Sequence, residues 1–322
     1  MRVAAILLAY AAIVAVAGPS WLRRVDWPQR APRLAIAVWQ TLSVAVLTAV
    51  VLAGIALAVP TGALSANFAS WLRACLMALR EGYATKGGTA LAVTGLLAAA
   101  AMTLRSAGCL IVGLVRAGRH RRSHADALAL LAPRSLGGDT VVVDYGSAAA
   151  YCLPGRHHRI VLTTAALAAL RDGELAAVLA HERAHLAGRH HLVLAFAESL
   201  RRAFPRIPLF RHAHDQIARL LEMLADDIAS DRHGRLTVAS AMSAMAGGVA
   251  PAAALAAGGP TALSRARRLI APVRPLPVRG VIAGVTLTAV IAVLPAVVAV
   301  APALAATQMA PCAAWYPPTN SS

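Results

Sequence analysis

The uncharged run Leu34–Val59 constrains the fold of this chain more than any other stretch. A helix of about 20 apolar residues crosses the hydrocarbon core of a bilayer, whereas a soluble helix of that length normally carries a polar face. Val281–Ala306 is uncharged too, Thr89–Val115 is interrupted by Arg105, and Val3–Ala17 is apolar but shorter. With 58% hydrophobic residues, the chain is too apolar for an ordinary soluble enzyme. We therefore predict about four transmembrane helices.

The basic residues predict the orientation of these spans. The chain has 31 Lys+Arg against 14 Asp+Glu, and its arginines gather beside spans, at 23–33, 116–122 and 265–279. Cytoplasmic flanks of membrane proteins carry such an excess. We expect a multi-pass protein of the plasma membrane with its N-terminus outside. If Val3–Ala17 were instead a cleaved signal peptide, the cluster at 116–122 would lie on the wrong side.

This orientation divides the chain into membrane and cytoplasmic parts. Residues 1–115 hold three transmembrane helices with an outer loop at about 61–88, 116–280 form a cytoplasmic domain, 281–306 are the fourth transmembrane helix, and 307–322 are a short outer tail. Cys75 and Cys312 then lie outside, where a disulfide can persist, and Cys152 is a free thiol inside. The lipid bilayer is the expected partner. Direct nucleic-acid binding is not expected, because the basic residues cluster at span edges and do not alternate with stacking aromatic residues.

The motif His181-Glu182-Arg183-Ala184-His185 reads HExxH within Leu175–Leu194, a run expected to be helical throughout. On a helix, residues four apart share a face, so both imidazoles can reach one metal ion, and zinc favours such ligands. Glu182 is placed to take a proton from a water molecule at the metal. Chance gives roughly 0.006 occurrences of this pattern in such a composition, which disfavours a coincidental pair of histidines on a solvated face.

A catalytic zinc site needs a third protein ligand. We favour Glu222, which begins an ExxAD pattern in another apolar helical run and is followed one turn later by Asp226. A carboxylate there can accept the second ring N–H of a zinc-bound histidine. His191 is the alternative metal ligand, because His181–His191 also spells HExxHxxGxxH, in which Gly188 would end the helix.

The helical interpretation of Leu175–Leu194 decides how the neighbouring polar residues are understood. On a continuous helix Glu198 lies about 20 Å beyond His185, which excludes it as a ligand. His190 is then a polar residue near the helix end. The prolines at 205 and 208 break the helix, and His212 and His214 follow them, either as loop histidines or as side chains that stabilise a transition state.

The segment before the motif predicts a small sheet. Short β-branched or alternating runs at Thr140–Tyr145, Ala150–Leu153 and Arg159–Thr163 are separated by glycine and proline, which is typical of an antiparallel arrangement. An edge strand of such a sheet can pair with an extended substrate. Ala125–Ala132 is expected to form a short separate helix.

Spans, an HExxH domain, an ExxAD helix and a closing span together resemble the membrane metallopeptidases of the BlaR/MecR type, which are bacterial beta-lactam-sensing signal transducers. The resemblance is best supported across 160–229 and includes Ile160–Thr164 and Glu174–Glu182. It implies zinc ligation by His181, His185 and Glu222, with Glu182 as the catalytic base. Membrane peptidases of the CAAX-processing and heat-shock type share both motifs. This chain departs from full-length transducers, because 16 residues without an SxxK serine follow Ala306, and it resembles a short form lacking the penicillin-binding sensor domain.

The expected fold is mostly α: a polytopic membrane protein with a cytoplasmic gluzincin-like α+β zinc peptidase domain. The expected function is a signal-transducing zinc metalloendopeptidase, linked to an antibiotic response. Its substrate would be a cytoplasmic protein such as a winged-helix transcriptional repressor, or a segment of the chain itself such as Gly247–Pro260. One alternative is a processing or quality-control peptidase for membrane proteins. The other is a non-enzymatic receptor or scaffold with a structural zinc site, in which His191 and Glu222 would both bind.

Overall fold

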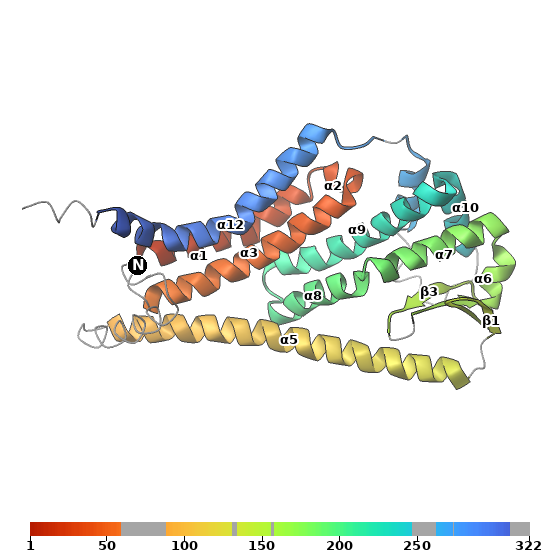
Figure 1. The fold of residues 1–322 in the computed structure, drawn as a ribbon, viewed down its shortest axis with the longest axis horizontal. Helices are drawn as coiled ribbons and strands as arrows, with labels where there is room; N and C mark the ends of the chain where they lie inside the picture. The colour runs from red at the N-terminus through yellow and green to blue at the C-terminus, as the bar shows by residue number, and fades with distance from the viewer. Residues whose placement is uncertain (59–87, 131–133, 156–157, 247–261, 273, 310–322) are drawn as a thin grey trace, which may run out of the picture.

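The structure is a computed structural model that describes residues 1–58, 88–130, 134–155, 158–246, 262–272 and 274–309. It is mostly helical with one small sheet (Figure 1). Cys75 and Cys312, the segment Gly247–Pro260 and nearly all of the outer loop lie outside the described residues. The helices are α1 (Arg2–Leu22), α2 (Trp27–Arg30), α3 (Pro32–Ala58), α5 (Gly88–Leu130), α6 (Thr164–Ala169), α7 (Asp172–Ala187), α8 (His190–Ala203), α9 (Pro208–His233), α10 (Arg235–Ala246) and α12 (Val278–Met309), and residues 262–270 are also helical.

Four of these helices are long and apolar enough to cross a membrane: α1, α3, Thr89–Leu128 of α5 and Val278–Pro302 of α12. They gather toward one end of the molecule, where α3 packs against α1, α5 and α12 (Figure 1). Two glycines let α3 and α5 approach closely, because a Cβ added at Gly95 would lie 2.8 Å from the carbonyl oxygen of Gly54. Small residues at such crossings are typical of membrane helices. This arrangement is consistent with a membrane protein.

The sheet lies at the other end of the molecule, beside α7 (Figure 1). Its strands are β1 (Arg134–Gly137), β2 (Thr140–Val143), β3 (Ala150–Leu153) and β4 (Arg159–Thr163), in the order β1-β2-β4-β3. The prediction of a purely antiparallel sheet is wrong, because β2 and β4 pair in parallel. All four residues of β1 are exposed, so no alternation of apolar and polar residues predicts this strand. The order leaves β3 at an edge.

Two helix predictions are also wrong. Ala125–Ala132 does not begin a separate helix, because α5 runs unbroken from the candidate span to Leu130, through the expected boundary at residue 115. The run Leu175–Leu194 is not one helix either. It breaks after Ala187, and Arg189 has a left-handed φ of 47°. The chain therefore turns between α7 and α8.

The α8–α9 hairpin joins the two ends of the molecule. α8 packs against α5, and α9 packs against α1 and α3 (Figure 1). Phe210 and Ile217 of α9 are fully buried in the same apolar cluster as Trp39 of α3. At the end of α8, Arg105 of α5 donates from Nε to the Ala203 carbonyl at 2.6 Å. A cation there satisfies a carbonyl that the helix leaves unpaired.

Candidate active site

The helix α7 presents the two histidines of the HExxH motif. It begins at Asp172, where the Glu174 carboxylate accepts the Arg171 backbone N–H at 3.0 Å. This contact satisfies a backbone donor at the helix start that has no partner within the helix. His181 and His185 follow one turn apart, and their Nε2 atoms lie 3.1 Å from each other. Both rings therefore aim the same nitrogen at one point.

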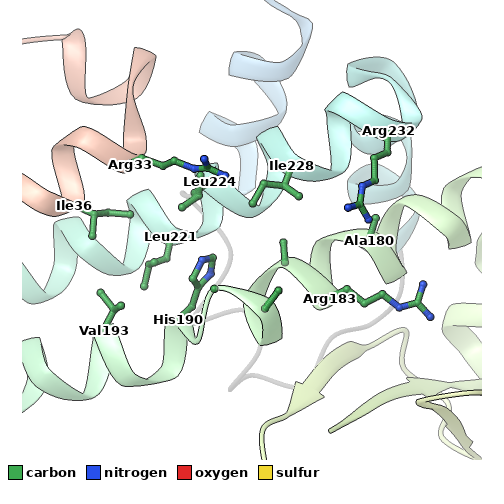
Figure 2. A pocket seen from close by; sticks show the side chains of 13 residues that line it. Arg33, Ile36, Ala180, Arg183, His190, Val193, Leu221, Leu224, Ile228 and Arg232 are labelled. Carbon is green, nitrogen blue, oxygen red and sulfur yellow. The ribbon is translucent and has the colours of Figure 1, made fainter. Parts of the chain in front are cut away.

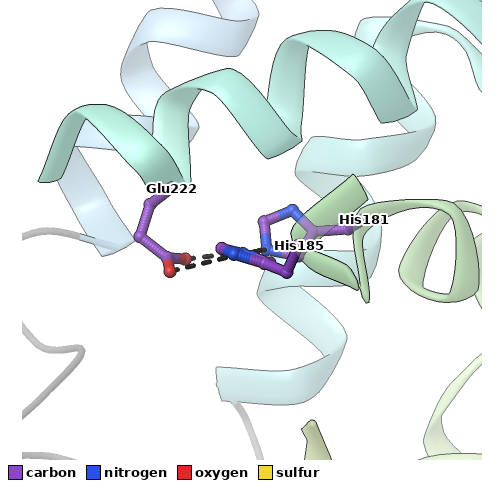
Figure 3. A group of neighbouring side chains, drawn as sticks. All are labelled: His181, His185 and Glu222. Carbon is purple, nitrogen blue, oxygen red and sulfur yellow. Dashed lines mark hydrogen bonds and ion pairs between the residues drawn. The ribbon is translucent and has the colours of Figure 1, made fainter. Parts of the chain in front are cut away.

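The carboxylate of Glu222 reaches that point from α9 (Figure 3). Its Oε2 lies 3.6 Å from His181 Nε2, and its Oε1 lies 3.4 Å from His185 Nε2. The three residues form the metal-competent group of the described part of the chain, with one ligand atom each within 4.8 Å of the others.

These separations fit a zinc ion. A tetrahedral ion about 2.0 Å from each ligand atom would separate those atoms by about 3.3 Å, and the observed separations are 3.1, 3.4 and 3.6 Å. Two histidines and one carboxylate are also a donor set of catalytic zinc sites, which leave the fourth position open. The group suits a catalytic metal in geometry and in chemistry.

Asp226 contacts His181 at Nδ1, the ring nitrogen that does not face the metal-competent group. Its Oδ1 lies 3.0 Å from His181 Nδ1, and the carboxylate is 1% exposed. When His181 is neutral, a proton on Nδ1 donated to Asp226 leaves Nε2 with the lone pair that a metal needs. The structure thus places Asp226 one helical turn beyond Glu222 and on the same site.

His190 holds the second histidine, and the sequence analysis did not assign it this position. Its Nδ1 lies 2.9 Å from His185 Nδ1, and its side chain is buried. If His185 Nδ1 donates, His190 Nδ1 accepts, so that His190 is neutral with its proton on Nε2. Its assignment as a polar residue near the helix end is wrong, because the turn at Arg189 folds α8 back toward α7.

Arg265 is the second residue that sequence reasoning missed. It comes from the helical segment 262–270 and was grouped with the basic flank of the last span. Its guanidinium is 14% exposed and donates to both oxygens of Asp226, from Nε at 2.7 Å and from Nη2 at 2.6 Å. Its Nη1 lies 2.8 Å from Glu222 Oε2. The one cation therefore fixes both carboxylates, and no local sequence signal marks a contact between residues so far apart.

These contacts set the charges of the site. Burial disfavours the charged form of His181, but hydrogen bonds to Asp226 and Glu222 outweigh it and raise its pKa to about 9. Burial lowers the pKa of His185 to about 4. Burial opposes ionisation of Glu222 and Asp226, yet His181 and Arg265 lower the pKa of both to about 2. At neutral pH both carboxylates are ionised, and His181 must lose a proton before its Nε2 can bind a metal.

Glu182 lies beside the histidines and faces a cavity of about 520 Å³. Burial raises the pKa of its carboxyl, and the nearby Glu222 charge adds to this, while His181 opposes it. Cys152, on the edge strand β3, lies close enough to lower the pKa of this carboxyl. Burial and this carboxylate raise the pKa of the Cys152 thiol to about 12. Cys152 is a free thiol and is not itself a nucleophile at neutral pH.

The remaining candidates lie elsewhere. His191 is outside the metal-competent group, and burial lowers its pKa, with Arg121 and His158 contributing. Glu198 pairs with Arg201 and Arg202. The expectation that His212 and His214 lie in a loop is wrong, because both are within α9, Pro208–His233.

Comparison with known proteins agrees with this geometry. Residues 131–271 match the family model of peptidase family M48, which supports a zinc metallopeptidase family and a protease function. The matched region holds the sheet and the helices α6 to α10, including every side chain of the site. Neither the search of curated proteins nor the search of solved structures found a match.

Proposed function

We propose that this chain is a membrane-bound zinc endopeptidase that cleaves an extended, apolar segment of a polypeptide near the membrane surface. One observation carries the proposal: His181, His185 and Glu222 converge at zinc-ligand separations beside the free carboxylate of Glu182. A bound zinc ion would polarise the scissile carbonyl and lower the pKa of an attacking water. Glu182 takes the proton of that water and passes it to the leaving amine.

The cavity beside Glu182 indicates the substrate. Beyond the polar site residues, its walls are small or apolar. β3 borders it and is an edge strand. An extended peptide pairing with that edge alternates its side chains between the two faces, so that an apolar side chain next to the scissile bond enters the cavity. The apolar lining residues are Ala148, Ala150, Ala177, Val178, Val238, Ala241, Met242, Met245, Ala246, Ala262, Leu263 and Ala266.

A peptide library tests this proposal. The protein, purified with zinc and reconstituted in liposomes, should cut peptides with an aliphatic residue beside the scissile bond and spare those with an acidic one. Ala266→Phe fills the cavity and should shift the preference toward smaller side chains, by about tenfold for each methylene that no longer fits. Arg267→Gln, at an exposed position of the same segment outside the cavity lining, serves as the control. Equal cleavage of acidic and aliphatic peptides would contradict the assigned cavity.

A structural zinc site is disfavoured by the geometry. Such a site closes four protein ligands around the ion, and that interpretation requires His191 to bind together with Glu222. Among the described residues the group contains three members and not His191. The fourth position therefore remains for water and substrate.

Signal transduction of the BlaR/MecR type is a second candidate function, favoured by the packing of the α8–α9 hairpin. Gln40 of α3 donates to the Val193 carbonyl of α8 at 3.2 Å, and Arg105 of α5 binds the Ala203 carbonyl. A shift of the spans would thus reach α9 and Glu222. The substrate would be a cytoplasmic repressor.

Co-expression with the repressor of a neighbouring gene, comparing the parent with Glu182→Gln under envelope stress, tests this role. An intact repressor in every condition would leave membrane-protein processing as the function.

A further inference from the structure

A second cavity, of about 530 Å³, lies between α3, α7, α8 and α9, and Glu182 is not among its lining residues (Figure 2). On α7 it contacts Ala180, Ala184 and Ala187, whereas the substrate cavity contacts Ala177, Val178, His181 and Glu182. The two linings have no residue in common. The second cavity is therefore not an extension of the substrate cavity.

Its walls combine branched apolar side chains with exposed cations. Ile36 of α3, Val193 of α8 and three residues of α9 form an apolar floor (Figure 2). The three α9 residues are Leu221, Leu224 and Ile228. Arg33 and Arg232 stand exposed at the edge, and among the described residues no carboxylate lines the cavity.

Arg33 and Arg232 can still form hydrogen bonds and ion pairs with a ligand. Arg183, a third cation of the lining, is bound to Asp139 with Nη2 3.0 Å from Oδ1. For Arg33 and Arg232, no hydrogen bond or ion pair occurs with any described residue. Each guanidinium carries five donors in a planar fork that matches the oxygens of a phosphate.

The cavity lies where a membrane helix begins. Arg33 is the second residue of α3, and Ile36 follows one turn later in the same candidate span. Arginines at the inner end of a span meet the negatively charged lipid headgroups, while an apolar floor that continues from that level suits an acyl chain. A peptide would need acceptors for its backbone N–H groups, and apart from His190 the described side chains of the lining are cations and alkyl groups.

We propose that this cavity binds one anionic phospholipid, its headgroup at the edge that carries Arg33 and Arg232 and one acyl chain over the apolar floor that includes Ile36, Leu221 and Val193. The site also touches the metal centre. His190 lines the cavity, and its Nδ1 contacts His185 Nδ1 at 2.9 Å. A bound chain packs on the His190 ring and restricts the residue that orients His185. Lipid binding itself does not depend on the proposed peptidase activity.

Native mass spectrometry of the full chain released from nanodiscs tests the proposal. With phosphatidylglycerol the parent should retain one lipid, and with phosphatidylcholine none. Arg33→Gln/Arg232→Gln should weaken phosphatidylglycerol binding about 25-fold, which is about fivefold for each arginine near an anionic lipid surface. Arg33→Lys/Arg232→Lys should keep most of the binding, because the charge remains.

Arg116→Gln/Arg119→Gln is the matched control, since it removes the same charge from exposed positions of α5 outside the cavity. It should bind the lipid as the parent does, and all variants should melt at the parental temperature. Equal retention of the lipid by both Gln double variants would overturn the proposal. Displacement of the lipid by millimolar inorganic phosphate would also overturn it, since the apolar floor would then contribute nothing.

Discussion

The two cavities beside α7 have nearly the same volume, about 520 and 530 Å³, and opposite chemistry. The substrate cavity contains an ionised network in which Arg265 is paired with both Asp226 and Glu222. The cavity on the other side contains Arg33 and Arg232, which pair with no described residue. Volume therefore says little about the ligand. The two cavities differ in how their charges are paired: Arg265 is paired with carboxylates of the protein, whereas Arg33 and Arg232 are paired with no described residue.

The helix α7 contributes to both cavities. It supplies His181 and Glu182 to the substrate cavity, and Ala180, Ala184 and Ala187 to the second cavity. His190 is the residue that belongs to both sides, because it lines the second cavity and contacts His185. Substitutions on the two faces should therefore have separable effects, and the predictions below follow in order of decreasing effect.

Glu182→Gln should abolish peptide cleavage while zinc and lipid binding remain. The amide cannot accept a proton, and loss of a general base costs about 10²–10⁴-fold in rate. The measurement is kcat/KM on a cleaved peptide, with zinc content and lipid retention measured on the same sample. A variant that cleaves as fast as the parent would remove the enzyme proposal.

Glu222→Gln should weaken zinc binding by more than about 100-fold, beyond what loss of an outer partner of a ligand costs. The change also leaves Arg265 Nη1 without its carboxylate. His191→Gln is the control, because His191 lies outside the ligand group. Competition with a zinc chelator gives both affinities. The reverse order would favour the His191 interpretation of the motif.

His190→Ala should weaken zinc binding by about 10–100-fold, the usual effect of removing the partner of a metal-bound histidine. His190→Asn restores an acceptor and should recover part of the loss, which a merely structural role would not predict. Phosphatidylglycerol retention should change less than in the arginine double variant. Unchanged zinc affinity in His190→Ala would separate the two faces completely and remove the proposed link.

Periodicity explains why part of the site could be predicted from the sequence. His181 and His185, like Glu222 and Asp226, are pairs spaced by one helical turn, and that spacing places each pair on one face before any tertiary contact is known. The structure brings both pairs together. The long uncharged runs likewise coincide with helices long enough to span a membrane.

The missed features depend on local breaks and distant contacts. On a continuous helix His190 would point away from His185, and the left-handed backbone of Arg189 reverses this. Arg265 lies 39 residues beyond Asp226 in sequence, and no periodic pattern predicts such a pair. The parallel pairing of β2 with β4 depends on strand order, which short runs of β-branched residues do not encode.

Zinc affinity should increase with pH. In the metal-free protein the pKa of His181 is about 9, so its ring is protonated at pH 7, and zinc must displace one proton. The affinity should rise by about tenfold per pH unit from pH 7 toward 9 and level off above that value. Isothermal titration calorimetry in buffers of different ionisation enthalpy should detect one released proton at pH 7. A pH-independent affinity between 7 and 9 would contradict the protonated state of His181.

X-ray absorption at the zinc edge tests the central claim most directly. The purified chain should contain one zinc ion. Its ligands should be two histidine nitrogens, from His181 and His185, each about 2.0 Å from the zinc, a carboxylate oxygen from Glu222 and a water oxygen. The water signal should persist in Glu182→Gln and the carboxylate contribution should disappear in Glu222→Gln. A sulfur ligand at about 2.3 Å, a third histidine, or protein without zinc would contradict the account.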